Sequence, residues 1–512
     1  MKSNRPSAVI IGAGVGGLFT GAILSREGYR VTVIEKNATI GGGLQSFSRF
    51  GLTFDTGMHV VGGLGAEGNV RHICRFLGIE DRLMVMDVDD DCTDELFFAE
   101  DNNTYRIAKG REGFICSLAN YFPEQREELR KYVDAVFQIS GSVDMFNLRP
   151  SNGQMALFAS GNSFLMAADE FISCYITDHR LRSILAYMNP LYGGRPGHTP
   201  AYIHAIISSL YIKGATRFVG GSQHVATLLK DVIVAEGGSV VAGDGVKEIV
   251  TNGHRHVECV RTVSGKEFQA DSYISAIHPC TMLKLLSEED ILPKAYRNRL
   301  EEIPNAHSAF TLNIRLRENA FPYINHSVYY MSSYDDVWNF SSTERPWPLG
   351  FLFMTPPEVN QGKYSNKAII TAPMPWQMVA PWQHTTIPGQ RGKEYETWKQ
   401  ERAEELLRMA VRMFPNLRDV VEQVNTASPL TIRDYYGVKE GSICGFSKDC
   451  KNIALSQLPV RTKIDNLLLT GQNNNLHGFC GVPLTAINTC EALLGPNYIL
   501  DKINKECQCG KK

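Results

Sequence analysis

The 512-residue sequence has almost no net charge, no long apolar run and no local array of metal-binding side chains. Fifty-two basic residues stand against fifty-four acidic ones, and the formal charge of −2 argues against broad electrostatic binding of nucleic acid. No uninterrupted apolar run reaches the roughly 18 residues of a membrane-spanning helix. We therefore expect no nucleic-acid partner and no integral helical membrane protein, while a peripheral contact with a membrane surface stays open.

Twelve cysteines are scattered from Cys74 to Cys509 without the dense spacing of a disulfide framework. A chain of this length buries a core without disulfides, which favours a reducing compartment, and we expect a cytoplasmic protein. There is no His-Glu-x-x-His or Cys-x-x-Cys array, and His254 and His256 lie at an expected hairpin tip, so we expect no metal site. The absence of a Gly-x-Ser-x-Gly element argues against a hydrolase of the nucleophile-elbow type.

The N-terminal region is rich in glycine. Directly after the apolar residues 8–11 it has the spacing Gly12-x-Gly14-x-x-Gly17. The apolar run predicts a buried strand of a parallel sheet, and residues 18–26 predict a helix that ends at Gly28. Gly12 permits the tight turn, Gly14 lets the backbone approach a pyrophosphate, and Gly17 lets the helix pack closely on the strand. This unit predicts a dinucleotide-binding cradle, formed by Gly12, Ala13, Gly14, Val15, Gly16 and Gly17.

A second predicted strand, residues 30–34, ends at Glu35, near the offset at which a carboxylate binds the ribose hydroxyls. These residues alone do not distinguish FAD from a nicotinamide cofactor. A second cluster, Gly41-Gly42-Gly43, lets more backbone approach a long ligand and favours FAD. Residues 63–68 repeat the glycine spacing, but Glu67 would place a carboxylate beside the phosphate, so we interpret them as a loop that leads into a helix.

The order of these motifs resembles the flavin-dependent family of phytoene desaturases, carotenoid isomerases and retinol saturases. The family pattern joins the dinucleotide fingerprint to a Glu-Lys pair, a Gly-Gly turn, a Phe-Asp-x-Gly element and a closing glycine-rich motif. The sequence matches these at Glu35-Lys36, Gly41-Gly42, Phe54-Asp55-Thr56-Gly57, and residues 467–472 with 478–486. Gly57-Met58-His59 and Thr470-Gly471-Gln472 are similar to the retinol saturase branch in particular.

The resemblance implies further FAD-binding residues: Lys36, Val246, Gly471, Gln472, Gly481 and Val482. In relatives the backbone at the position of Val246 meets the adenine, and the closing motif lies along the flavin. Gly43 stands where many relatives carry Arg or another polar residue, so the pyrophosphate contact of that side chain is either absent here or supplied by the backbone. His59 is the one candidate catalytic residue, because it follows the element that approaches the cofactor; it either contacts substrate or flavin or orients its loop.

The resemblance also implies an FAD-dependent oxidoreductase that acts on carbon–carbon bonds of a long apolar polyene or isoprenoid lipid. A retinol saturase-like reduction is favoured, and carotenoid cis–trans isomerisation or a phytoene desaturase-like reaction are the alternatives. NAD(P)H stays open as an external reductant, although no second nucleotide-binding fold is found. Two other classes are an NAD-dependent dehydrogenase, which leaves the C-terminal glycine motif unexplained, and a non-catalytic lipid carrier.

The predicted fold class is α/β, with a Rossmann-type FAD-binding domain around a parallel sheet and a mixed α+β substrate domain. We expect the FAD-binding domain to be discontinuous, since connected elements need not be local: residues 1–85, 215–285 and 456–505. Residues 86–214 and 286–455 form the substrate domain, and 506–512 a disordered tail. The helical part of the substrate domain, residues 154–187, is rich in Met and Phe. This composition predicts buried core, with a tunnel mouth or a membrane-facing surface as the alternatives.

Overall fold

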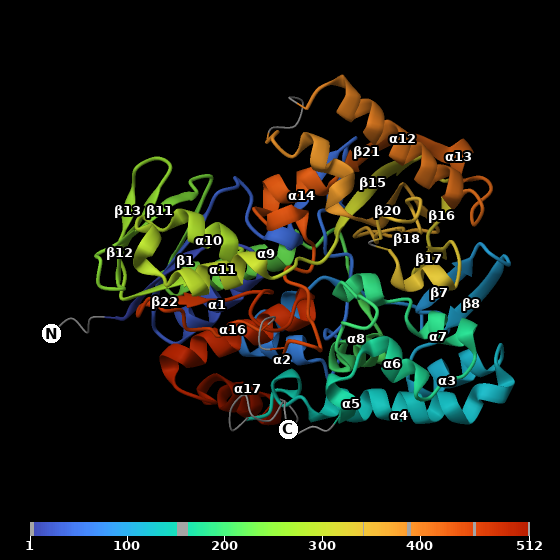
Figure 1. Ribbon diagram of the computed structural model, residues 1–512, viewed down its shortest axis with the longest axis horizontal. Helices are drawn as coiled ribbons and strands as arrows, with labels where there is room; N and C mark the ends of the chain where they lie inside the picture. The colour runs from blue at the N-terminus through green and yellow to red at the C-terminus, as the bar shows by residue number, and fades with distance from the viewer. Residues whose placement is uncertain (1–4, 151–161, 341, 387–390, 454–456, 510–512) are drawn as a thin grey trace.

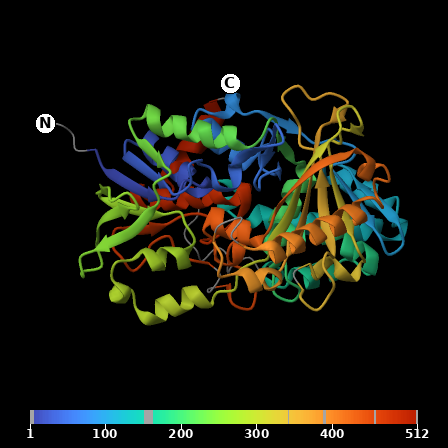
Figure 2. The same ribbon diagram turned by 90° about the horizontal axis from the view of Figure 1, so that it is seen from above.

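The computed structural model describes residues 5–150, 162–340, 342–386, 391–453 and 457–509. Two sheets dominate it, a five-stranded parallel sheet and a seven-stranded mixed sheet, which lie toward opposite ends of the long axis (Figures 1 and 2). The predicted α/β class, with a parallel sheet in one part and mixed α and β structure in the other, is confirmed.

The parallel sheet takes its strands from three distant parts of the chain. The strand order is β10-β2-β1-β14-β22, with β1 in the middle and all five of its residues buried. The bounds are β1 (Ser7–Ile11), β2 (Arg30–Glu35), β10 (Ser239–Ala242), β14 (Ser272–Ser275) and β22 (Leu467–Leu469). This strand membership supports a discontinuous cofactor domain, whose division from the rest of the chain stays our proposal.

Three helices cover one face of the parallel sheet. α1 (Val15–Arg26) packs against both α9 (Gln223–Ala235) and α16 (Gly478–Leu494), and every residue of α1 before Arg26 is buried. The helix begins three residues earlier than predicted, because its glycine-rich first turn is already helical. It ends as predicted just before Gly28, which has φ +86°.

A small antiparallel sheet extends the cofactor side of the molecule. β11 (Val246–Thr251) pairs with β12 (Val257–Thr262), and β12 pairs with β13 (Glu267–Phe268). The strand ends enclose residues 252–256, where the sequence places Asn252-Gly253. This hairpin carries Val246 to the end of β2, beside the predicted ribose carboxylate.

The seven-stranded sheet and the helices beside it form the other half. Its order is β21-β15-β20-β18-β17-β7-β8, and only β17 and β7 pair in parallel. The bounds are β7 (Asp94–Phe98), β8 (Asn103–Ile107), β15 (Ser308–Leu316), β17 (Ser327–Met331), β18 (Gly350–Met354), β20 (Lys367–Met374) and β21 (Val421–Ala427).

Helices of the middle of the chain lie below this sheet in Figure 1, drawn in cyan and green. They include α3 (Arg111–Ala119), α4 (Arg126–Ser142), α6 (Ala168–Ser173), α7 (His179–Leu185) and α8 (Ala201–Lys213). α8 is buried except at Tyr211 and Lys213. Residues 154–161 of the predicted Met- and Phe-rich region lie outside the described residues, whereas Phe164 and Phe171 beyond them are buried core.

The C-terminus corrects one expectation. α17 (Tyr498–Cys509) includes residues 506–509, which we predicted as the start of a disordered tail. The helix forms because Ile499, Leu500 and Ile503 are buried and Cys507 packs against the same core, beside α2 (Asn69–Phe76). Across the described ranges, no helix is both long and apolar enough to cross a membrane.

Candidate functional site

The turn between β1 and α1 forms the predicted cradle. Gly12 has φ +100°, and its N–H donates to the Ile34 carbonyl oxygen at 2.8 Å, which closes the turn against β2. A Cβ atom on Gly17 would lie 2.0 Å from the Gly12 carbonyl oxygen, so only glycine lets α1 pack this closely. A Cβ atom on Gly14 would meet nothing within 4 Å. Packing therefore requires Gly12 and Gly17, whereas Gly14 borders open space.

The N-terminus of α1 faces that space without a side-chain cap. Gly14 is the N-cap residue, no side chain bonds to the cap, and the first turn, which includes Val15, Gly16 and Gly17, contains no acidic residue. The first N–H groups of a helix have no partner within the helix, and its dipole is positive at this end. The arrangement suits a bound anion such as a pyrophosphate.

Glu35 ends β2 with its carboxylate turned toward the cradle. Its Oε2 accepts from the Ala13 N–H at 2.8 Å, its Oε1 accepts from the Asn37 N–H at 2.9 Å, and the residue is buried. A carboxylate held by the backbone at this point is oriented for the ribose edge of a dinucleotide. Val246 begins β11 next to it, since a Cβ atom on the preceding Gly245 would lie 2.6 Å from the Lys36 Cβ.

The Lys36 side chain takes a different direction from the cradle. Its Nζ donates to the Asp434 carbonyl oxygen at 2.6 Å and lies close to Gly437. Burial lowers the pKa of Lys36, and the nearby Glu35 and Asp434 carboxylates oppose that shift. Lys36 therefore ties β2 to the end of α14 (Pro429–Tyr436), and only its backbone stays beside the predicted adenine site.

The second glycine cluster lies directly on the first. The Gly41 N–H donates to the Ala13 carbonyl oxygen at 2.7 Å, and Gly41 forms a parallel bridge with Gly14. A Cβ atom on Gly42 would lie 3.1 Å from the Gly14 Cα. The Gly43 carbonyl oxygen accepts from the Met58 N–H at 3.1 Å, which brings the segment before His59 to the same place.

The closing motif reaches the cradle from the far end of the chain. A Cβ atom on Gly16 would lie 2.9 Å from the Gly471 Cα and 3.3 Å from the Val482 side chain. Thr20 and Thr470, 450 residues apart in sequence, share a buried hydrogen bond of 3.0 Å. Gln472 is half-buried in the turn after Gly471. The two ends of the predicted cofactor site are therefore in contact.

A tight turn leads from this motif into α16. A Cβ atom on Gly481 would lie 2.5 Å from the Leu476 Cβ, so the turn closes only around glycine. Asn473, within it, is buried, and its Oδ1 accepts from the Phe446 N–H at 2.9 Å. The sequence did not predict this contact. A run of three asparagines is typical of a polar loop, and nothing near it in the sequence points to the backbone of Phe446.

Tyr436 is a second residue that sequence reasoning missed. Its hydroxyl donates to Thr56 Oγ1 at 3.0 Å and lies 2.9 Å from where a Gly57 Cβ would be. Burial raises the pKa of Tyr436 to about 12, which keeps the phenol neutral. The phenol thus covers the glycine turns at Gly43 and Gly57. The absence of a side chain at both positions is the local signal that a large side chain packs there.

His59 lies half-buried behind this turn. Its Nδ1 is shielded from solvent and has no hydrogen-bond partner among the described residues. Burial lowers the pKa of His59; the Asp55 carboxylate opposes the shift, while Arg217 and Lys367 add to it. The imidazole is therefore neutral near pH 7, with one ring nitrogen available to a ligand group.

The Phe-Asp-x-Gly element itself is held by its aspartate. Asp55 is buried, and its Oδ1 accepts from the Ser46 hydroxyl at 2.6 Å, the Ser222 N–H at 2.8 Å and the Ser222 hydroxyl at 3.1 Å. These bonds join β4 (Leu52–Asp55) to the start of α9. Through Oδ1, Asp55 thus holds the loop that presents His59.

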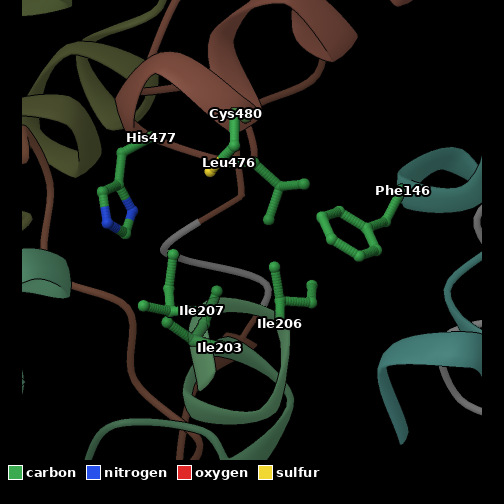
Figure 3. A pocket seen from close by; sticks show the side chains of 8 residues that line it. Phe146, Ile203, Ile206, Ile207, Leu476, His477 and Cys480 are labelled. Atoms are coloured by element: carbon green, nitrogen blue, oxygen red, sulfur yellow. The ribbon is translucent and has the colours of Figure 1, made fainter. Parts of the chain in front are cut away.

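A small apolar pocket of about 10 Å³, roughly room for one water molecule, lies beside the closing motif (Figure 3). Figure 3 shows two walls facing each other, one from α8 and one from the turn before α16, with Phe146 at the side. The lining residues are Phe146, Ile203, Ile206, Ile207, Leu476, His477, Cys480 and Gly481. Gly481 thus belongs both to the predicted flavin segment and to the wall of this pocket.

His477 is the polar residue of the pocket. Its Nε2 lies 3.2 Å from the Leu191 carbonyl oxygen, and burial lowers its pKa to about 4. A neutral imidazole that is already bonded to a carbonyl leaves the pocket uncharged. A larger, more open pocket of about 340 Å³, lined partly by Gly65, Leu210 and Lys213, shares Phe146 with the apolar one.

Comparison with known proteins decides the family. Residues 15–483 match the family described as flavin containing amine oxidoreductase. The chain belongs to this family. The matched span runs from the cradle to the closing motif, as a cofactor held between the two ends of the chain requires.

This flavin-containing oxidoreductase is similar to named relatives along most of its length. All-trans-retinol 13,14-reductase of Rattus norvegicus is 26% identical over 536 residues, which cover 96% of this chain and 86% of the relative. Prolycopene isomerase 2, chloroplastic, of an Oncidium hybrid cultivar is 27% identical over 464 residues, covering 86% and 75%. The resemblance to retinol saturases and carotenoid isomerases is confirmed.

The fold recurs in solved structures of low sequence identity. An oxidoreductase from Methanosarcina mazei aligns with a TM-score of 0.62 at 17% identity, covering 95% of this chain and all of that one. The family implies FAD, and the residues described above fit it: open space at Gly14, an uncapped helix N-terminus, a buried carboxylate at Glu35 and bare backbone at Gly471.

Proposed function

We propose that this flavin-dependent oxidoreductase acts on a carbon–carbon double bond of a long apolar polyene or isoprenoid lipid, and that it reduces that bond. The observation that carries the proposal is the apolar lining of this pocket, whose wall includes Gly481 of the closing motif. At about 10 Å³ the pocket must widen for a hydrocarbon chain to enter. A pocket lined by aliphatic and aromatic side chains beside the cofactor segment selects a hydrocarbon. The retinol reductase and prolycopene isomerase relatives support the same substrate class.

In this proposal the cofactor lies extended between the chain ends. Gly12 to Gly17 and the α1 N-terminus hold the pyrophosphate, Glu35 the ribose, and the backbone of Gly41, Gly42 and Gly43 a second phosphate edge. The backbone of Lys36 and Val246 borders the adenine, and Gly471, Gln472, Gly481 and Val482 border the flavin. When bound and reduced, FAD supplies the hydride equivalent that a double bond takes up.

The chain itself supplies alignment and a dry, uncharged site. Ile203, Ile206 and Ile207 press the hydrocarbon toward the closing motif and exclude water. His477 is neutral at pH 7 because its pKa is about 4. This wall therefore carries no charged side chain that would hold water in the site. Phe146 separates the apolar pocket from the open one, which places it on the route by which a lipid would enter.

His59 is the proposed polar contact. Its unpartnered Nδ1 can bond a hydroxyl at the polar end of the substrate, or hold the proton that the second carbon of the double bond receives. The contact with a hydroxyl suits the neutral imidazole that burial favours, whereas proton delivery requires the imidazolium that the same burial disfavours. The hydroxyl contact is therefore the favoured role.

Cis–trans isomerisation is the second candidate, favoured by the prolycopene isomerase relatives. It needs the same apolar pocket and the same cofactor, but no net gain of hydrogen. Because the pocket lining is common to both reactions, only the product distinguishes them.

The test is anaerobic incubation of the flavin-loaded protein, chemically reduced beforehand, with a panel of polyenes, followed by mass analysis. We expect a product heavier by two hydrogens. An unchanged mass with a shifted isomer would favour isomerisation, and a product lighter by two hydrogens, from oxidised protein, desaturation. Bound flavin that converts none of the polyenes would overturn the proposal in favour of a carrier.

We also propose how the substrate and the electrons arrive. An apolar lipid resides in membranes, so we expect the protein to contact a membrane surface from the cytoplasmic side. NAD(P)H is the proposed external reductant. Stopped-flow mixing with NADPH or NADH should bleach the bound flavin; if neither does, a partner protein donates the electrons instead.

A further inference from the structure

A cluster of metal-ligating side chains lies where β7 and β17 begin. Cys92 stands just before β7, Glu95 is its second residue, and His326 immediately precedes β17. β7 and β17 are parallel neighbours, with Ser327 opposite Asp94. One ligand atom from each of Cys92, Glu95 and His326 lies within 4.8 Å of the other two. None of the three belongs to the predicted cofactor segments or to the apolar pocket.

The three side chains form a donor set suited to zinc. Thiolate sulfur, imidazole nitrogen and carboxylate oxygen bind Zn²⁺ at about 2.3, 2.0 and 2.1 Å, almost always with tetrahedral geometry. Ligand atoms around such an ion are therefore roughly 3.3–3.8 Å apart. Side-chain movements of about 1 Å bring the cluster to that spacing, which is within the freedom of these rotamers.

Two independent observations point to a ligand. The Nδ1 atom of His326 is buried and has no hydrogen-bond partner among the described residues. Asp89 Oδ2 lies 3.8 Å from that nitrogen, the spacing of two ligands on one ion rather than of a hydrogen bond. The other oxygen, Oδ1, accepts from Asn325 Nδ2 at 3.0 Å, which keeps the carboxylate beside the cluster.

The surrounding charges balance a bound ion. Arg106 on β8 pairs in register with Glu95, and its Nη1 lies 4.0 Å from Glu95 Oε2. A thiolate, two carboxylates and a divalent ion sum to one negative charge, which the Arg106 guanidinium offsets. Arg217 is buried and donates to the His326 carbonyl oxygen at 2.9 Å, which holds the backbone of that ligand.

We propose that Cys92, Glu95 and His326 bind one Zn²⁺ ion that ties the start of β7 to the start of β17, and that Asp89, which lies beside His326 but outside the mutual cluster of the other three, turns in as the fourth ligand. Such a site is structural, because four protein ligands leave no open position for a substrate. Without the ion, Glu95 and Arg106 still neutralise each other, so the fold does not depend on the metal.

The test uses the full-length, flavin-loaded protein, stripped with a chelator and titrated with Zn²⁺. We expect one zinc per chain to survive gel filtration, and zinc-edge X-ray absorption to show one sulfur ligand at about 2.3 Å. His326→Gln and Glu95→Gln should each weaken zinc binding by about 100-fold while flavin content stays unchanged. Cys92→Ser should also remove the sulfur signal.

Cys174→Ser is the matched control, because Cys174 is an exposed thiol outside the cluster. It should leave zinc content and affinity unchanged. If stripped protein takes up no zinc, or if His326→Gln and Glu95→Gln bind it as tightly as the parent, the site does not exist. None of these readouts depends on turnover, so the proposed function and the proposed site fail separately.

Discussion

Gly14 and Gly65 hold the middle place in two matching glycine patterns, and a Cβ atom on either would meet nothing within 4 Å. What separates them is their surroundings. Gly14 caps a buried helix whose first turn has no acidic residue, and it bridges to Gly41. Gly65 lies in a loop that carries Glu67 and leads into α2. The same spacing therefore predicts a phosphate site in one place only.

Gly14→Asp should abolish flavin retention, because the added carboxylate would face the pyrophosphate in a space that is otherwise open. Gly65→Asp, the same change in the other pattern, should retain a full complement of flavin. The measurement is the flavin-to-protein absorbance ratio after gel filtration. A Gly14→Asp protein that keeps its flavin would show that the cradle is misplaced.

His59→Ala should keep its flavin and lower turnover by about 10-fold or more, since the ring nitrogen that meets the ligand is lost. His59→Asn should recover part of the rate, because its amide can stand near the position of Nδ1. Steady-state rates of the three proteins, each corrected for flavin content, decide the matter. Unchanged turnover in His59→Ala would leave the imidazole a purely structural role in its loop.

At the scale of elements, local signals predicted local structure well. The β1–α1–β2 unit follows from glycines and apolar runs that are close in sequence, and the β11–β12 hairpin follows from its turn residues. The apolar pocket was not predicted, because α8 and the turn before α16 meet only in the folded chain. The cluster of Cys92, Glu95 and His326 escaped for the same reason: its members share no local spacing.

The end of α17 was predicted wrongly for a related reason. Residues 506–509 are mostly polar, and polarity at a terminus is typical of disorder. The helix continues because its preceding turns bury Ile499 and Ile503 against the core. Packing that lies elsewhere in the sequence outweighed the local composition.

Helix α8 offers a matched pair for testing the pocket. Ile206 lines the pocket and Ile212 does not, yet both are buried in the same helix. Each change to Ala should cost about 2–4 kcal/mol of unfolding free energy. Only Ile206→Ala should also shift substrate preference toward bulkier polyenes, by about 10-fold in kcat/KM. Equal preference in the two variants would remove the pocket from the substrate path.

At the scale of the whole molecule, buried histidines make stability depend on pH. Burial lowers the pKa of His204 to about 3 and those of His278 and His477 to about 4. The unfolded chain binds protons near pH 6.5, before the folded protein does, so stability present at pH 7 is lost as the pH falls toward 4. Asp94, whose pKa burial raises to about 6, works in the opposite direction.

We expect each of these three buried imidazoles to lower the free energy of unfolding by about 2 kcal/mol when the pH falls from 7 to 5. His477→Gln keeps a donor for the Leu191 carbonyl oxygen and should make the loss smaller. His254→Gln, at the exposed hairpin tip, should not change it. Urea unfolding of the three proteins at both pH values measures the effect, and equal losses in all three would contradict it.

The contact between Gly16 and Gly471 sets a limit on how the protein can be made. A ribosome delivers the first glycine turn several hundred residues before the segment that completes the cofactor cleft. Flavin loading must then wait for the synthesis of that later segment, and a chain terminated before Gly471 would be released as a colourless polypeptide.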